Sequence, residues 1–255
     1  MSKQSLPIAV QLYSLRNLKL PFDEILGGVA AIGYSGVELI NNHGISSDEM
    51  KALLSKHNLV ACSAHVPIQA IESDPQAVID FHSAVDNHVI VIPWIGEDMR
   101  GSDAATWQSF GRKLDGIGQR FADAGMKLLY HNHDFEMRVF NDQTGIEWML
   151  DAAKPSNLGW EADVAWIARG GQQIERLLDK YAGRIPRLHA KDNAPVGQNV
   201  DQGGFADVGH GTVEWPGVLA AAKRAGVEWY VVEHDLPKDP MHSIKRSYEF
   251  LSANL

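Results

Sequence analysis

Short β-rich runs alternate with longer amphipathic stretches along this chain, and this alternation limits the possible folds more than any other feature. Between the runs, apolar residues recur at spacings of three and four, as at Trp107, Phe110 and Leu114, which is typical of amphipathic helices. Alternating strands and helices imply a parallel sheet with right-handed crossovers. We expect strands at Ile8–Tyr13, Gly36–Ile40, Leu59–His65, His88–Pro93, Lys127–His131, Leu158–Asp163, Arg184–Ala190 and Trp229–Glu233.

Eight such units in 255 residues favour a closed barrel over an open doubly wound sheet. Capping signals support the helices: Ser46 precedes an acidic first turn, and Gly33 and Gly125 each stand directly before a strand. No Gly-x-Gly-x-x-Gly fingerprint follows the first strand, which argues against a dinucleotide-binding fold. No linker or low-complexity segment marks a second domain. The sequence therefore predicts α/β class, with one (β/α)8 TIM-barrel domain over residues 1–255.

Composition and charge limit the class of protein and the compartment in which it is expected. The chain is 45% hydrophobic and 22% charged, as in ordinary soluble globular proteins, and its net charge of −9 opposes binding to nucleic acid or to anionic membranes. Residues 1–7 have no apolar signal-peptide core, and no apolar stretch approaches the roughly 18 residues of a membrane span. The single cysteine, Cys62, cannot form an internal disulfide and is best interpreted as a packed side chain. We expect a cytoplasmic protein.

Acids and imidazoles follow several of the expected strands. In a barrel of this kind the active site lies at the carboxyl ends of the strands, so polar residues there are candidates for chemistry. This criterion selects Gln11, Glu38, His65, His131, His133, Glu136, Asp163, His189, Lys191, Glu233 and Asp235.

Glu136, Asp163, His189 and Glu233 form the sharpest subset, since they follow four successive strands. Their mainly oxygen donors suit Mn²⁺, Mg²⁺ or Co²⁺, and Zn²⁺ is also compatible. Three carboxylates around one dication leave about one negative charge, which favours neutral polyols over multiply charged anions. Asp163 also has a simpler interpretation, because an Asp before a helix is often only an N-cap. Its alignment with Glu136, His189 and Glu233 favours the interpretation of Asp163 as a metal ligand.

At this point the chain resembles the xylose isomerase-like TIM barrels, which include sugar phosphate isomerases and epimerases. The resemblance covers essentially the whole chain and depends on several motifs together. They are residues 10–16 (VQLYSLR), 36–39 (GVEL), 64–66 (AHV), 130–136 (YHNHDFE), 163–166 (DVAW), 189–192 (HAKD), 209–215 (GHGTVEW) and 232–235 (VEHD).

The resemblance implies a divalent metal held by Glu, Asp, His and Glu from the fifth to eighth strands. Glu136, Asp163, His189 and Glu233 match these ligands by position. Two departures stand out. Many relatives place the first glutamate inside the fifth strand, where this chain has Tyr130 or His131, so either Glu136 reaches back or a histidine replaces it. Relatives usually carry an acid where this chain has His210.

The implied activity is isomerisation or epimerisation of a sugar, sugar phosphate or keto-sugar through a metal-stabilised enediolate. Glu136 and Glu233 would transfer the proton while holding metal, and His65 and Lys191 would complete the catalytic set. The expected substrate contacts are Gln11, Glu38, His131, His133, Trp166 and His210.

Three alternatives remain open. The same site can serve a dehydratase, lyase or hydratase acting on a keto-sugar or cyclitol, because an enediolate can also expel a leaving group. A DNA-repair endonuclease resembling endonuclease IV would need more metal ligands and a basic surface. A non-catalytic sugar-binding barrel would bind without turnover. The expected partner is a small sugar-derived molecule, and a homo-oligomer is compatible with the sequence.

Overall fold

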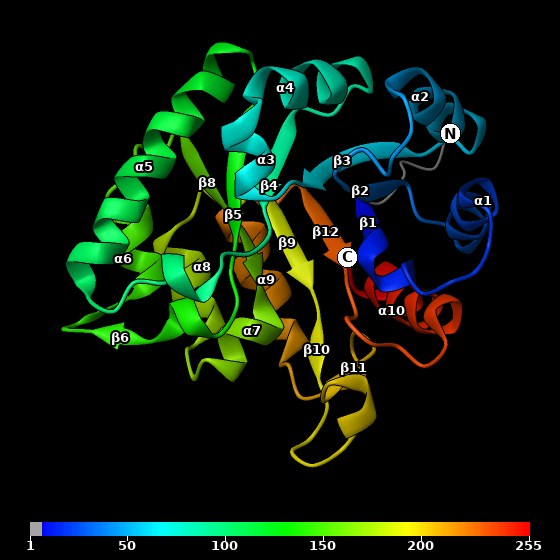
Figure 1. Ribbon diagram of the computed structural model, residues 1–255. Coiled ribbons are helices and arrows are strands. Elements are labelled where there is room, and N and C mark those ends of the chain that lie inside the picture. Colours follow the sequence, from blue (N-terminus) through cyan, green and yellow to red (C-terminus); the bar gives the residue numbers. More distant parts are fainter. Residues whose placement is uncertain (1–6) are drawn as a thin grey trace.

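A computed structural model describes residues 7–255 of the chain (Figure 1). Residues 1–6 lie outside the described residues. They include most of the segment, residues 1–7, from which we predicted that a signal peptide is absent. Eight parallel strands close into a barrel in the order β1-β12-β9-β8-β5-β4-β3-β2. Their bounds are β1 Ile8–Gln11, β2 Gly36–Ile40, β3 Val60–His65, β4 Val89–Ile92, β5 Lys127–His131, β8 Leu158–Asp163, β9 Arg187–Ala190 and β12 Trp229–Val232.

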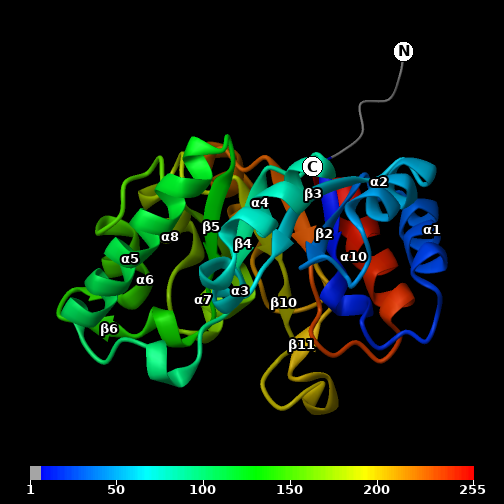
Figure 2. The same cartoon turned by 45° about the horizontal axis from the view of Figure 1, so that its top comes forward.

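Helices surround the barrel on its outer side (Figures 1 and 2). They are α1 Phe22–Ile32, α2 Ser47–Lys56, α3 Ile68–Ser73, α4 Pro75–Ala84, α5 Ala104–Asp123, α6 Gly145–Asp151, α7 Val164–Arg169, α8 Ile174–Lys180, α9 Trp215–Ala225 and α10 Pro240–Asn254. The expected capping residues act as such: the Ser46 side chain accepts a hydrogen bond from the Glu49 amide, and Gly33 ends α1 with a φ of 121°. No helix within residues 7–255 has the length and apolar character needed to cross a bilayer.

The predicted barrel is confirmed, and all eight predicted strands form it. Five strands are shorter than expected: the third, fourth and eighth by one residue at one or both ends, and the first and seventh by more. The first ends at Gln11 because the chain turns into a 3₁₀ helix, η1 Leu12–Leu15. The seventh begins at Arg187 and not at Arg184, since Pro186 has no N–H to donate to the ladder.

Side chains alternate between the two faces of the barrel wall. Ile8, Val10 and Tyr130 belong to the large core between the barrel and its helices. Two small apolar clusters fill the inside of the barrel: Ala9, Cys62 and Val231 in one, Val89, Val91 and Leu129 in the other. Cys62 is therefore the packed side chain that was expected, and burial raises the pKa of its thiol to about 12.

The long loop after the seventh strand forms a small arm that projects from the barrel (Figures 1 and 2). It contains β10 Asp192–Asn193 and β11 Phe205–Ala206, which pair antiparallel, and the 3₁₀ helix η4 Val200–Gln202. A second two-stranded sheet pairs β6 Val139–Phe140 with β7 Gln143–Thr144, and the 3₁₀ helices η2 Glu97–Met99 and η3 Phe135–Met137 complete the elements. Asp192 fixes the base of the arm, accepting hydrogen bonds from the Gly209 and Val213 amides and from Trp215 Nε1.

Candidate metal centre

Buried acids and imidazoles gather inside the barrel at the carboxyl ends of neighbouring strands. Among residues 7–255 they form two overlapping groups whose donor atoms lie within 4.8 Å of one another. The upper group is His131, Asp163, His189 and Glu233, and the lower group is His65, His131, Glu161 and His189. Alternation along each strand explains the gathering: Leu129 and His131 share one face of β5, and Glu161 and Asp163 share one face of β8.

The upper group has the spacing of metal ligands. His189 Nδ1 lies 3.3 Å from Glu233 Oε2, and His131 Nε2 lies 3.9 Å from Asp163 Oδ2. The two carboxylate oxygens of Asp163 have different surroundings, so capping a helix leaves one of them available. Oδ1 accepts a hydrogen bond from the Trp166 amide at 2.9 Å and caps α7, whereas the buried Oδ2 has no hydrogen-bond partner among the described residues. An orphaned buried carboxylate oxygen beside two imidazoles fits a cation.

Lys191 is buried beside this group. Its Nζ lies 2.5 Å from Asp235 Oδ1, 3.2 Å from Glu233 Oε2 and 3.8 Å from Asp163 Oδ2. Burial alone would lower the pKa of this ammonium, but the attraction of Glu233 and Asp235 outweighs it and raises the pKa. The same ammonium holds the pKa of Glu233 well below its usual range, against the effect of burial. Lys191 is thus a fixed positive charge at the site.

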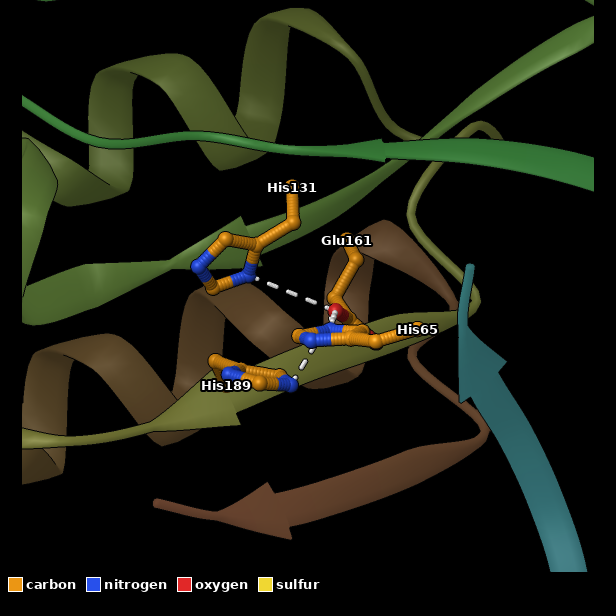
Figure 3. Close-up of side chains that lie close together, drawn as sticks. All are labelled: His65, His131, Glu161 and His189. Carbon is orange, nitrogen blue, oxygen red and sulfur yellow. Dashed lines mark hydrogen bonds and ion pairs between the residues drawn. The ribbon is translucent and has the colours of Figure 1, made fainter. Parts of the chain in front are cut away.

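The lower group is held together by short hydrogen bonds (Figure 3). His65 Nε2 lies 2.8 Å from Glu161 Oε2, and His189 Nε2 lies 3.0 Å from the same oxygen. Glu38 joins them, since its Oε2 is 2.7 Å from His189 Nε2 and 3.1 Å from His65 Nε2. Gln11 Nε2 donates to Glu38 Oε2 at 2.6 Å. Despite burial, Glu161 and Glu38 raise the pKa of His189 well above its ordinary value, and a metal ion would compete with that proton.

Glu136 is not brought into either group, although it was expected to hold the metal. Its Oε1 accepts a hydrogen bond from the Tyr130 hydroxyl at 2.6 Å, and its Oε2 accepts one from the His133 amide at 2.8 Å. Tyr130 faces the helices, where its ring packs edge-on against Phe110 of α5. Glu136 therefore lies on the outer side of the barrel wall, where burial raises its pKa to about 8. His131 lies at the fifth-strand position in the upper group, the second of the two arrangements left open by the sequence.

The structure places the expected substrate contacts in four settings. His131 and His133 line a cavity of about 580 Å³ at the barrel mouth, together with the expected catalytic residues His65, Lys191 and Glu233. Gln11 and Glu38 lie beneath it in the hydrogen-bonded network, with no exposed surface. Trp166 lies beside the site, its ring 5.2 Å from that of His133.

His210 is exposed and lines a different cavity with His234 and Arg246, so it is not brought to the barrel mouth. The arm explains this displacement, because Asp192 draws the Gly209 and Gly211 amides toward itself and carries His210 away from the strand ends.

Two residues at the centre were missed by the sequence criterion. Glu161 stands two residues before Asp163, so strand alternation alone would have placed both on the inner face. Asn132 is fully buried and ties the end of β5 to the end of β8: its Oδ1 accepts hydrogen bonds from Trp160 Nε1 and the Asp163 amide, both at 2.9 Å. No sequence signal separates this Asn from an ordinary loop residue.

The site lies on a barrel whose sequence matches a known family model over residues 27–254. The chain belongs to the xylose isomerase-like TIM barrel family. A curated relative named inosose dehydratase, from Clostridium botulinum, is 23% identical over 86% of this chain and 83% of its own length.

Solved structures share the fold. A sugar phosphate isomerase/epimerase from Parabacteroides distasonis superimposes with a TM-score of 0.83 at 20% identity, covering 99% of this chain and 96% of the other. The IOLI protein, solved with a zinc atom, superimposes with a TM-score of 0.74 at 16% identity, covering 98% of this chain and 99% of the other.

Proposed function

We propose that this protein is a divalent-metal-dependent dehydratase that removes water from a polyhydroxylated ketone of the keto-cyclitol class, such as inosose. The upper group carries the proposal, because its four buried donors lie close together, one carboxylate oxygen among them is orphaned, and His131 and Glu233 line the barrel-mouth cavity. The relatives named inosose dehydratase favour dehydration over the isomerisation or epimerisation that the sequence first indicated.

His131, Asp163, His189 and Glu233 would hold the cation. A shell of two imidazoles and two carboxylates suits Mn²⁺, Co²⁺ or Zn²⁺ better than Mg²⁺. Two carboxylates balance one dication, and Lys191 and Asp235 balance each other, which favours a neutral polyol ketone as substrate. A bound cation would supply Lewis-acid stabilisation of the negative charge that develops on the substrate oxygen when the neighbouring proton leaves.

The surrounding side chains are suited to the remaining steps. Dehydration breaks a C–H bond beside the carbonyl and a C–O bond on the next carbon, and the departing hydroxyl takes up a proton to leave as water. We assign proton transfer to Glu233 and His133, which both line the cavity. Lys191 would donate a hydrogen bond to a substrate oxygen that gains negative charge, and His65 would orient a hydroxyl from the opposite wall.

Product analysis tests the proposal. Protein loaded with Mn²⁺ or Co²⁺ should convert inosose to a product lighter by one water, and chelation should abolish turnover until metal is restored. The Glu233→Gln variant should lose turnover, whereas Glu249→Gln, on the exposed surface of α10, makes the same charge change and should keep it. A product of unchanged mass would instead indicate an isomerase or epimerase. Binding that survives chelation without any turnover would indicate a non-catalytic sugar-binding barrel.

A further inference from the structure

The lower group raises a question that the upper group does not, because four donors within 4.8 Å of one another could themselves hold a second metal ion. The distances argue against this. Ligands bound to one tetrahedral cation at 2.0–2.2 Å are about 3.3–3.6 Å apart. In the lower group the His65 Nε2 to Glu161 Oε2 distance is 2.8 Å and the His189 Nε2 to Glu161 Oε2 distance is 3.0 Å. These are the lengths of hydrogen bonds.

His131 and His189 belong to both groups, and each ring directs one nitrogen toward the upper group and the other toward the lower group. His189 turns Nε2 to the lower carboxylates and Nδ1 to Glu233, 3.3 Å away. His131 has Nδ1 3.3 Å from Glu161 Oε2 and Nε2 toward Asp163. Two metal ions would require each of these rings to bridge as an anion. One metal ion in the upper group requires only that each ring keep a proton on, or a contact through, the nitrogen that faces the lower group.

We propose that Glu161 and Glu38 are positioning residues for a single metal ion in the upper group, and that the lower group holds none. An acceptor below His189 fixes the proton on Nε2 and leaves the Nδ1 lone pair directed at the metal position. Glu161 Oε2 also lies 3.3 Å from His131 Nδ1, at ion-pair distance but without hydrogen-bond geometry, so one carboxylate acts on two of the four ligands. Gln11 holds Glu38 in turn through the 2.6 Å hydrogen bond to its Oε2.

This arrangement explains why such costly groups are buried. Glu38 and Glu161 have no exposed surface, and each keeps one oxygen, Oε1, without a hydrogen-bond partner among the described residues. Burying two carboxylates is unfavourable unless cationic or donor groups compensate them. The compensation here comes from His65, His189 and Gln11. The inference rests on the metal centre of the proposed function, but not on dehydration.

The test measures metal binding directly. Wild-type protein should bind about one Co²⁺ or Mn²⁺ per chain, and Glu161→Gln should weaken binding about 10- to 100-fold in competition with a chelating dye. The Co²⁺ absorption spectrum should also shift, because the orientation of two imidazole ligands changes. Glu38→Gln provides a second variant and should weaken binding less, as Glu38 contacts only one shared ligand.

Glu147→Gln is the matched control. Glu147 is a buried carboxylate that caps α6 and binds Arg176 and Lys180, away from the barrel mouth. It should lose stability while keeping metal affinity and spectrum. Two metal ions in wild type with one lost in Glu161→Gln would overturn the inference, as would unchanged affinity and spectrum in both variants, or no metal bound by wild type. Metal binding as expected but no loss of water from inosose would refute the dehydratase alone.

Discussion

Replacing Asn132 by Ala should both destabilise the protein and loosen the proposed metal centre. The buried side chain accepts hydrogen bonds from Trp160 Nε1 and from the Asp163 amide, and donates to the Asp163 carbonyl at 3.3 Å. In Asn132→Ala two buried donors lose their acceptor. Each buried donor left unsatisfied costs about 1–3 kcal/mol, so the loss should be about 2–6 kcal/mol in total. For a chain of this size each kcal/mol lowers the melting temperature by about 2–4 °C, which predicts a drop of roughly 10 °C.

The functional effect follows from the same bonds. Asn132 holds both the N–H and the C=O of Asp163, so its loss frees the backbone that aims the orphaned Oδ2. Metal affinity should therefore fall at least about 10-fold, as it does when outer-shell partners are removed. Thermal unfolding of metal-free protein measures the first effect, and chelator competition on folded protein measures the second.

Asn157→Ala is the matched control. Asn157 is also buried and donates to Asp115 Oδ1 at 3.0 Å and to Gln119 Oε1 at 3.3 Å, beside the opposite end of β8. It should lower the melting temperature without changing metal affinity. A drop below about 2 °C in Asn132→Ala would show that Asn132 bonds contribute little. An equal loss of affinity in both variants would show that general destabilisation, and not the placement of Asp163, controls metal binding.

Three further outcomes follow from residues away from the metal centre. Gly118→Ala should destabilise the protein by about 1–3 kcal/mol, because a Cβ there collides with the Asn157 carbonyl. Gly116→Ala on the same helix meets no atom within 4 Å and should stabilise the protein by about 0.5–1 kcal/mol. Urea unfolding that ranks the two variants otherwise would contradict this reasoning. Burial lowers the pKa of His82 to about 4, so its neutral ring contributes on the order of 3 kcal/mol to folding stability above pH 6.5, and this contribution is lost as pH falls toward 4. His82→Gln should make the melting temperature fall less steeply over this pH range. An unchanged dependence of melting temperature on pH would refute this. Cys62 should resist a thiol reagent in the native protein and react fully in denaturant, since it is buried with a raised pKa; rapid native labelling would contradict the packing.

The barrel was predictable because its signals are local and repeated. Each strand carries its own β-rich run, each helix its own spacing of three and four, and the count of units decides closure. Strand ends were less certain for equally local reasons. At the first strand a 3₁₀ helix competes with extension after Gln11, and at the seventh Pro186 removes a ladder donor. Neither change moves a side chain from one face to the other, so the placement of Gln11 and His189 inside the barrel was unaffected.

The site was predictable only as far as strand alternation reaches. Asp163, His189 and Glu233 stand at strand ends, where the inner face is set by the pleat, and they do come together. Glu136 stands five residues beyond β5, and one 3₁₀ turn is enough to direct it to the Tyr130 hydroxyl on the other side of the wall. The alternation that places Tyr130 outside requires His131 to face inside. A histidine at this position contributes no charge to the shell, so the centre changes from three carboxylates to two. That change removes from the proposed shell the net negative charge expected from the sequence, while Asp235 compensates the charge of Lys191.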